Sequence, residues 1–144
     1  LNKDERIGTQ QILLIVLTVI IVGIAIAVGL TMFRAYVMNS NRQAVLSDLN
    51  LMSASIIAYF KTPTTQGGGV YDIEKISMYL GYQYYPAGDS LTTGNGNYLF
   101  SYGMYGTLTI QGFGTEIGND GENRVKTTMT ISPYINNISV LVNN

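Results

Sequence analysis

The first third of the chain contains one long apolar segment. It runs from Ile12 to Phe33, and no charged residue occurs between Ile7 and Phe33. An α-helix rises about 1.5 Å per residue, so a helix of this length can cross the roughly 30 Å hydrocarbon core of a bilayer. A cleaved secretory signal has a shorter apolar region, of about 7–15 residues, so we expect this segment to be retained. Because it is apolar all round, we predict that it is buried in lipid or against other copies of the chain.

After Arg34 the apolar residues become restricted to one face of a helix. They recur three, four or seven positions apart, and they are Met38, Val45, Leu49, Met52, Ile56 and Tyr59. Polar residues, Asp48 among them, are expected on the opposite face. Pro63 opposes any continuation of the helix, since proline restricts the residue before it and lacks an N–H donor. We therefore predict one helix from about Thr9 to about Tyr59, on the order of 75 Å long, within residues 1–60.

A connector and a short helix are predicted next. Residues 61–72 include the threonine, proline and glycine stretch TPTTQGGGV, which is typical of a connector. Asp72 then has the chemistry of a helix N-cap, and Gly81 that of a C-terminal stop. The spacing of Ile73, Ile76 and Leu80 places them on one face of this helix.

The period of the apolar pattern changes to two after Tyr98. Residues 107–113 and 124–132 alternate between apolar and polar side chains, and a β-branched run closes the chain after the break at SPYINN. We predict a meander of three or four antiparallel strands in a β-rich head, residues 73–144. The stripe of residues 38–60 is the long apolar face that can cover such a sheet, so the expected fold class is α+β.

Composition restricts the chemistry that the chain can perform. Its 144 residues carry a net charge of −1, with 12% charged residues, which offers no basic surface for nucleic acid. It contains no cysteine and no histidine, which excludes disulfides, thiolate or imidazole metal sites, and nucleophile–histidine pairs. We therefore predict no catalytic residues, no metal site and no cofactor.

Three local motifs have ordinary interpretations. The acidic and amide side chains of GNDGEN, residues 118–123, lack the spacing of a calcium loop and predict a hydrophilic turn. The clustered tyrosines after residue 78 are expected to pack within the head or between heads. Asn137 begins an N-I-S motif, which makes it a weak candidate for N-linked glycosylation.

This layout resembles that of type IV pilins. The resemblance rests on the run Ile12–Phe33, the amphipathic continuation to Phe60 and the strand-rich end. It implies a filament subunit whose N-terminal helices form the filament core. It also implies insertion into the inner membrane before assembly, a pilus assembly machinery as partner, and a final location in an extracellular filament. Pilins usually carry a glutamate at the fifth position of an apolar start.

The beginning of this chain departs from the pilin pattern. Glu5 is the fifth residue, but Lys3, Asp4 and Arg6 around it are charged. Cleavage after Gly8 is an alternative start of the mature protein, although we favour Leu1. With Leu1 as the start, we expect Lys3, Asp4, Glu5 and Arg6 to pair within or between subunits, since unpaired charges are costly in apolar surroundings.

Small residues in the apolar segment suggest close helix packing. Gly23 with Ala27, and Ala25 with Gly29, have the small-xxx-small spacing that lets helices approach closely. The residues expected at subunit contacts are Ile12, Leu13, Val16, Ile20, Gly23, Ile24, Ala27, Gly29 and Leu30.

Two classes of function stay open at this point. The first is a homo-oligomeric structural filament, favoured by a helix much longer than a membrane requires and by the small head. The second is a single-span membrane-anchored protein whose head binds a ligand, or a minor pseudopilin of a secretion system.

Overall fold

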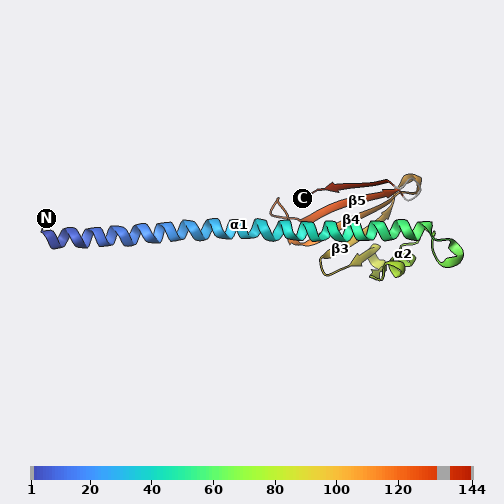
Figure 1. The fold of residues 1–144 in the computed structure, drawn as a ribbon, viewed down its shortest axis with the longest axis horizontal. Helices are drawn as coiled ribbons and strands as arrows, with labels where there is room; N and C mark the ends of the chain where they lie inside the picture. Colours follow the sequence, from blue (N-terminus) through green and yellow to red (C-terminus); the bar gives the residue numbers. More distant parts are fainter. Residues whose placement is uncertain (1, 133–136, 144) are drawn as a thin grey trace. The chain divides into compact units, whose positions relative to one another are not determined.

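The computed structural model describes residues 2–132 and 137–143 of the chain. These residues form a long helix α1, a short helix α2, three 3₁₀ turns and six strands (Figure 1). The chain divides into two compact units, Leu1–Val37 and Met38–Asn144.

Helix α1 (Lys3–Lys61) contains 59 residues and begins earlier than the predicted start near Thr9. Its first turn supplies the reason. The backbone N–H of Asn2 donates to the Glu5 carboxylate at 3.3 Å, which is half of a capping box. Asp4 and Glu5 also lie in the first turn, where the helix dipole favours negative charge. The charged residues therefore start the helix instead of preceding it.

The connector after α1 is held by hydrogen bonds to the end of that helix. The N–H of Gly69 donates to the Tyr59 carbonyl at 3.0 Å, and the Tyr59 hydroxyl donates to the Val70 carbonyl at 3.1 Å. A Cβ on Gly68 would lie 2.6 Å from the Tyr59 carbonyl oxygen, so this close return of the chain requires glycine. The predicted connector thus contains a compact return, including the 3₁₀ turn Thr64–Gln66.

Helix α2 (Ile73–Leu80) confirms the predicted caps. The Asp72 carboxylate accepts hydrogen bonds from the N–H groups of Glu74, at 3.0 Å, and Lys75, at 3.4 Å. Gly81 ends the helix with φ 75°, the left-handed conformation in which glycine carries no Cβ penalty.

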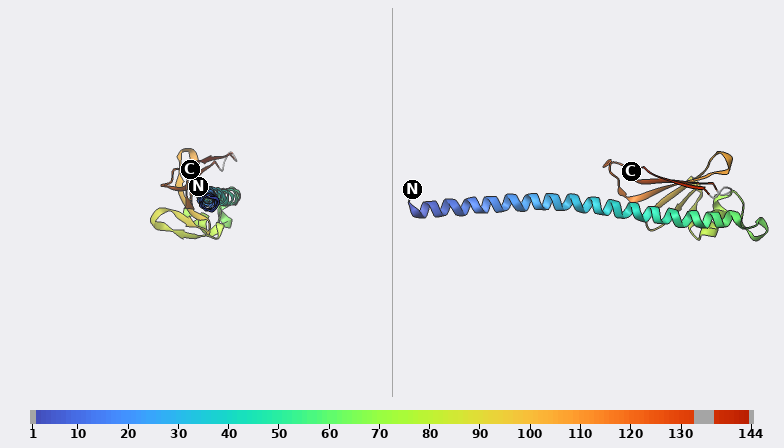
Figure 2. Two further views of the ribbon diagram at one scale, coloured as in Figure 1. Left: turned by 90° about the vertical axis from the view of Figure 1, so that its left-hand side faces the viewer. Right: turned by 45° about the horizontal axis from the view of Figure 1, so that its top comes forward.

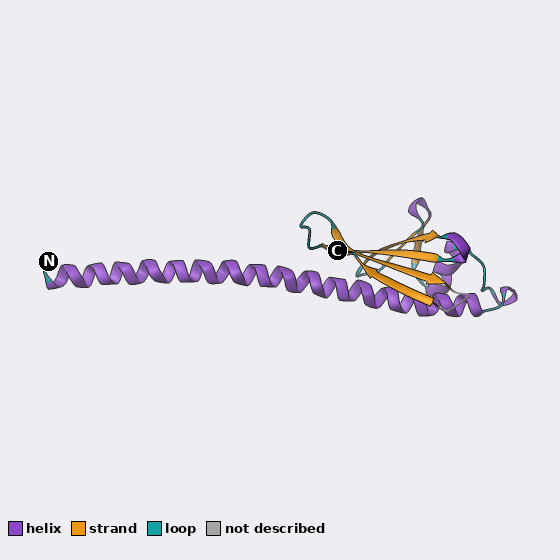
Figure 3. Ribbon diagram, turned by 90° about the horizontal axis from the view of Figure 1, so that it is seen from above, coloured by secondary structure: helices purple, strands orange, loops and turns teal. Residues whose placement is uncertain are grey.

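The six strands form one antiparallel sheet in sequence order. Figure 3 shows strands of this sheet, in orange, beside the end of α1. They are β1 (Gln83–Tyr85), β2 (Ser90–Thr92), β3 (Gly96–Tyr102), β4 (Leu108–Ile117), β5 (Arg124–Ser132) and β6 (Asn137–Val142). The predicted meander is confirmed, but the predicted count of three or four strands is wrong. The first two strands have three residues each, too few for a period-two pattern to be recognised. The predicted break at SPYINN falls mainly on residues 133–136, outside the described residues.

The two longest strands place their apolar residues on one face, as the alternation predicted. Leu108 pairs with Ile131 and Ile110 with Met129, and all four are fully buried. The alternate residues of β5, starting with Arg124, lie on the opposite face of the sheet. The sheet therefore has one apolar face and one wet face.

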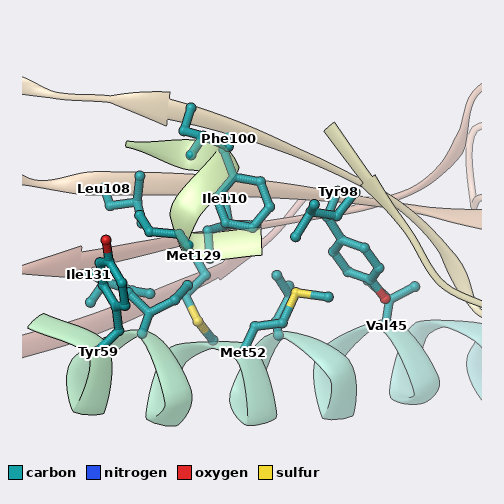
Figure 4. Packing of buried hydrophobic residues seen from close by; sticks show 14 residues of the cluster. Val45, Met52, Tyr59, Tyr98, Phe100, Leu108, Ile110, Met129 and Ile131 are labelled. Atoms are coloured by element: carbon teal, nitrogen blue, oxygen red, sulfur yellow. The ribbon is translucent and has the colours of Figure 1, made fainter. Parts of the chain in front are cut away.

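The second half of α1 covers the apolar face of the sheet (Figures 2 and 4). The helix contributes Val45, Leu49, Met52, Ile56 and Tyr59, and the sheet contributes Leu91, Tyr98, Phe100, Leu108, Ile110, Met129 and Ile131. Met38, the first residue of the predicted stripe, is only half-buried and lies outside this cluster. One helical face packed on one sheet confirms the α+β fold class.

Candidate functional site

The most unusual surface of the molecule is the apolar segment Ile12–Phe33. Its large side chains are exposed, with 65% exposure at Ile12 and 60% at Ile24. The most apolar 18-residue window of α1 has no buried residue, and α1 is long and apolar enough to cross a membrane by length and composition. Exposed apolar surface of this extent marks contact with lipid or with other protein chains.

The residues predicted at subunit contacts all lie in this exposed segment. Within the described residues none of them is buried. They are Ile12, Leu13, Val16, Ile20, Gly23, Ile24, Ala27, Gly29 and Leu30. Six of them follow one another at spacings of three or four, so they share a side of the helix. The predicted contact residues therefore include one continuous row along a helix segment that is apolar all round.

The glycines of this segment have no packing role within the chain. A Cβ built on Gly23 or Gly29 meets no atom within 4 Å. Glycine in a helix interior is less favourable than alanine by about 0.5–1 kcal/mol. Within the described part of the chain, no neighbouring atom requires glycine at these two positions.

The polar groups of the segment are satisfied by its own backbone. The Thr18 hydroxyl donates to the Leu14 carbonyl at 2.7 Å, and the Thr31 hydroxyl donates to the Ala27 carbonyl at 2.9 Å. These bonds allow both threonines to enter apolar surroundings without an unpaired donor.

The four charged residues at the start of α1 are exposed. Among the described residues, no ion pair joins Lys3, Asp4, Glu5 or Arg6 to another side chain. Glu5 is engaged instead in capping the helix through Asn2. The predicted pairing of these charges would therefore have to form between subunits.

The head contains a half-buried polar network that the sequence pattern did not predict. The Asp48 carboxylate accepts hydrogen bonds from the hydroxyls of Thr93 and Tyr98, both at 2.8 Å, and from the Asn95 amide at 3.1 Å. Burial, and then the hydrogen bond to Asp48, raise the pKa of Tyr98. Asp48 was assigned to the solvated face. Its position three residues after Val45 and four before Met52 places it on the edge of the apolar stripe, and that spacing was the available signal.

Asn41 makes a second polar contact between α1 and the sheet. Its side-chain oxygen accepts from the N–H groups of Thr115, at 3.1 Å, and Glu116, at 3.3 Å. These residues lie where the pairing of β4 with β5 is irregular, between Phe113 and Ile117. The contact therefore satisfies backbone donors at a bulge, which is a structural role.

The other motifs fall on the surface of the head. Asp120 accepts from the backbone N–H groups of Glu122 and Asn123, at 3.1 and 2.9 Å, which makes residues 118–123 a hydrogen-bonded turn. No group of three or more acidic, histidine or cysteine side chains in the described residues could hold a metal ion. Asn137 is exposed at the start of β6 and pairs with Ser132 of β5.

The tyrosines divide between the core and the surface. Tyr59 and Tyr98 are buried, whereas Tyr79 is 50% exposed and contacts the Tyr59 ring edge to face. The Tyr84 hydroxyl donates to Asp89 at 2.6 Å, and this bond raises the pKa of Tyr84 to about 12. The predicted packing of tyrosines within the head therefore applies to part of the set.

Comparisons of the chain with family models, with curated proteins and with solved structures found no match. Function is therefore inferred from the residues and their geometry. Of the features described above, the exposed apolar segment is the one that is typical of contact with lipid or with other protein chains.

Proposed function

We propose that this chain is the structural subunit of a type IV pilus-like filament. Identical subunits polymerise through Ile12–Phe33, which lies in the inner membrane before the assembly machinery transfers it into the filament. The filament is extracellular and attached to the cell surface. The observation that carries the proposal is that every residue of this segment is exposed, in a helix whose later turns supply part of the core of the head.

The energetics of the exposed segment support self-association. Burying one large aliphatic side chain gains roughly 1.5–3 kcal/mol. Ile20, Ile24 and Leu30 are each 51–60% exposed, and many others in the segment are similar. A bundle of identical helices removes this surface from water as completely as a bilayer does. Transfer from membrane to filament is therefore energetically reasonable.

The small residues support close contacts in such a bundle. Gly23 and Ala27, like Ala25 and Gly29, bring two small side chains to one face of the helix. Two backbones approach closely at such positions, and the van der Waals contact between them increases. This role also accounts for the glycines that have no intrachain contact.

The proposed role requires no catalysis, cofactor, metal ion or nucleic acid. The chain has no cysteine or histidine, and the half-buried carboxylate of Asp48 accepts hydrogen bonds from three side chains. The satisfied network stabilises the head instead of activating a substrate.

A membrane-anchored role is the second candidate. A single helix long and apolar enough to cross a membrane favours a single-span protein with a ligand-binding head, or a minor pseudopilin of a secretion system. In either case the protein would stay in lipid or enter another machine in small numbers, and it would not polymerise by itself.

Electron microscopy of the full chain, expressed with a pilus assembly machinery, separates these candidates. We expect filaments of uniform width from the wild type and none from Ile24→Asp, because the charge would be buried without a partner. Leu51→Asp is the matched control, since Leu51 is 62% exposed and Ile24 60% exposed on the same helix. Monodisperse detergent-bound particles from the wild type would overturn the filament and favour the anchored protein.

A further inference from the structure

An open cavity lies on the wet face of the sheet, at the end that carries the β4–β5 turn. Its volume is about 590 Å³, within the usual range of about 300–1,000 Å³ for ligand sites. It is lined by Phe113, Asp120, Asn123, Arg124, Lys126 and Asn143. Arg124 and Lys126 alternate with the buried residues Val125 and Thr127, so the cavity opens away from the face that α1 covers.

Two cations, Arg124 and Lys126, line this cavity. Among the described residues neither Arg124 nor Lys126 forms an ion pair. The Lys126 ammonium lies 5.4 Å from the centre of the Phe113 ring, a cation–π distance that holds it at the cavity wall. Two residues of the same parity on a strand are about 7 Å apart, so both cations can reach one anionic group.

The one carboxylate in the lining is directed to its own turn. Asp120 accepts the N–H groups of Glu122 and Asn123, and its other oxygen accepts the Asn123 amide at 2.6 Å. These hydrogen bonds leave the charge of the carboxylate in place. Within the described residues the lining therefore carries two cations and one carboxylate, an excess of one positive charge, which favours an anionic ligand.

The amide side chains add neutral hydrogen-bonding groups. The Asn143 side-chain oxygen accepts from the Thr128 hydroxyl at 2.9 Å, and the side-chain N–H groups of Asn143 have no acceptor among the described residues. The side-chain nitrogen of Asn123 donates to Asp120. The side-chain oxygen of Asn123 is therefore the group that can accept a hydrogen bond from a ligand. One donor and one acceptor amide suit the vicinal hydroxyls of a sugar ring.

The backbone around the cavity is already paired, which disfavours an extended peptide. Phe113 pairs with Lys126 across β4 and β5, and the N–H of Asn143 donates to the Lys126 carbonyl at 3.0 Å. A peptide adds to a sheet through free edge groups, whereas Phe113 and Lys126 lie on adjacent paired strands inside the sheet. A ligand must therefore be recognised by its charge and its hydroxyls.

We propose that this cavity binds a carboxylate-bearing sugar, such as a uronic acid unit of an acidic polysaccharide. The carboxylate contacts Arg124 and Lys126, and the hydroxyls contact Asn123 and Asn143. The site belongs to a single head and does not depend on filament formation. In a polymer the same site would recur along the surface and add avidity to a weak single contact.

Calorimetry on the full-length protein in neutral detergent tests the site. The probes are a galacturonate trisaccharide and the uncharged galactose trisaccharide of the same linkage. We expect the acidic probe to bind at least about tenfold more tightly, and Arg124→Gln or Lys126→Gln each to weaken it about tenfold, because a charge-assisted hydrogen bond is lost. Lys75→Gln removes an exposed lysine of α2, outside the cavity, and should bind like the wild type.

Several results would overturn the proposal. The first is that the acidic probe does not bind, and the second is that the neutral probe binds as tightly as the acidic probe. The third is that Lys75→Gln weakens binding of the acidic probe as much as Arg124→Gln or Lys126→Gln does. If equimolar inorganic phosphate displaced the acidic probe, the cavity would be an unspecific anion site. If a tri-aspartate peptide bound more tightly than the acidic probe, the ligand would be an acidic peptide and not a sugar. Unchanged thermal melting verifies folding of each variant. The assembly of filaments by Arg124→Gln separates failure of this site from failure of the proposed function.

Discussion

Two stretches of helix α1 have similar apolar residues and opposite environments. Ile24, in Ile12–Phe33, is 60% exposed, whereas Ile56, in the stripe that meets the sheet, is fully buried. The first stretch is apolar all round, and the second is apolar on one face. A stripe needs one covering surface, which the sheet provides, but an all-round apolar helix needs apolar neighbours on every side. The distribution of apolar residues therefore distinguishes the stretch that we propose as an assembly element from the stretch that forms the core.

The polar residues of α1 show the same contrast. Thr18 and Thr31 bond only to backbone carbonyls one turn earlier in the helix. Asn41 and Asp48 bond instead to residues at least 45 positions away in sequence, on the sheet. A helix entering lipid or a bundle must satisfy its polar groups alone, whereas a helix fixed on a sheet can use cross-element bonds that hold it in place.

The largest effect is expected from a charge in the all-round apolar stretch. Gly23→Asp should abolish filament assembly, since an unpaired carboxylate would lie among apolar side chains. Counting filaments by electron microscopy measures the effect. Gly23→Ala is the matched control: it adds one methyl group without charge and should reduce assembly only partly, through the loss of close helix contact. Normal filaments from Gly23→Asp would show that this stretch is not the assembly element.

The next largest effect is expected when the stripe is removed from the head. The fragment 61–144 lacks Val45, Leu49, Met52, Ile56 and Tyr59, so the apolar face of its sheet is uncovered. We expect no cooperative thermal transition for 61–144 and a clear one for 35–144. The filament should melt at the highest temperature, because contacts made only by folded subunits stabilise folding by mass action. Calorimetry of the three samples measures the order.

Equal melting temperatures for all three samples would contradict this prediction. The head would then be stable without its helix, and the separation of α1 into an assembly part and a core part would lose its physical basis.

The sequence predicts an element correctly where its pattern extends over several helical turns or several residues of a strand. The stripe from Val45 to Tyr59, the alternation in β4 and β5, and the caps Asp72 and Gly81 all act through local rules, and the structure has each of them. The exposed apolar segment was equally recognisable, since no charge interrupts it.

Features that depend on distant residues could not be predicted in this way. Strands β1 and β2 exist because β3 pairs with β2, and three residues carry no period of their own. The cavity brings Phe113, Lys126 and Asn143 together through the pairing of β4, β5 and β6. The bond between Asp48 and Tyr98 crosses 50 residues of sequence. These contacts depend on the register of the strands, which the sequence pattern does not predict.

A core truncation should separate the two stretches in stability. Ile56→Ala should lower the free energy of unfolding of the head by about 2–5 kcal/mol, because it leaves a cavity at a fully buried site. Ile20→Ala, at a position 53% exposed, should leave this value unchanged within about 0.5 kcal/mol. Urea titration of both full-length variants in detergent, followed by tyrosine fluorescence, measures the difference. Similar losses for the two variants would show that the stretches are not energetically distinct.

The smallest effect is expected from one hydroxyl of the Asp48 network. Tyr98→Phe should lower the free energy of unfolding by about 1 kcal/mol near neutral pH, because Asp48 keeps its bonds from Thr93 and Asn95. The exposed Tyr105, replaced by phenylalanine, is the matched control and should change nothing.

The pKa of Tyr98 predicts how the stability of the Tyr98→Phe variant changes with pH. In the folded head, burial and the bond to Asp48 raise the pKa of Tyr98 above its ordinary value of about 10. The folded state therefore keeps the proton that the unfolded chain releases, and the wild type loses stability as the pH rises above about 10. Tyr98→Phe should show a shallower loss in urea titrations at about pH 8 and about pH 11, although Tyr59 and Tyr102 still contribute because their pKa values are raised too. An unchanged slope would mean that the phenol of Tyr98 is not protected by the network that joins α1 to the sheet.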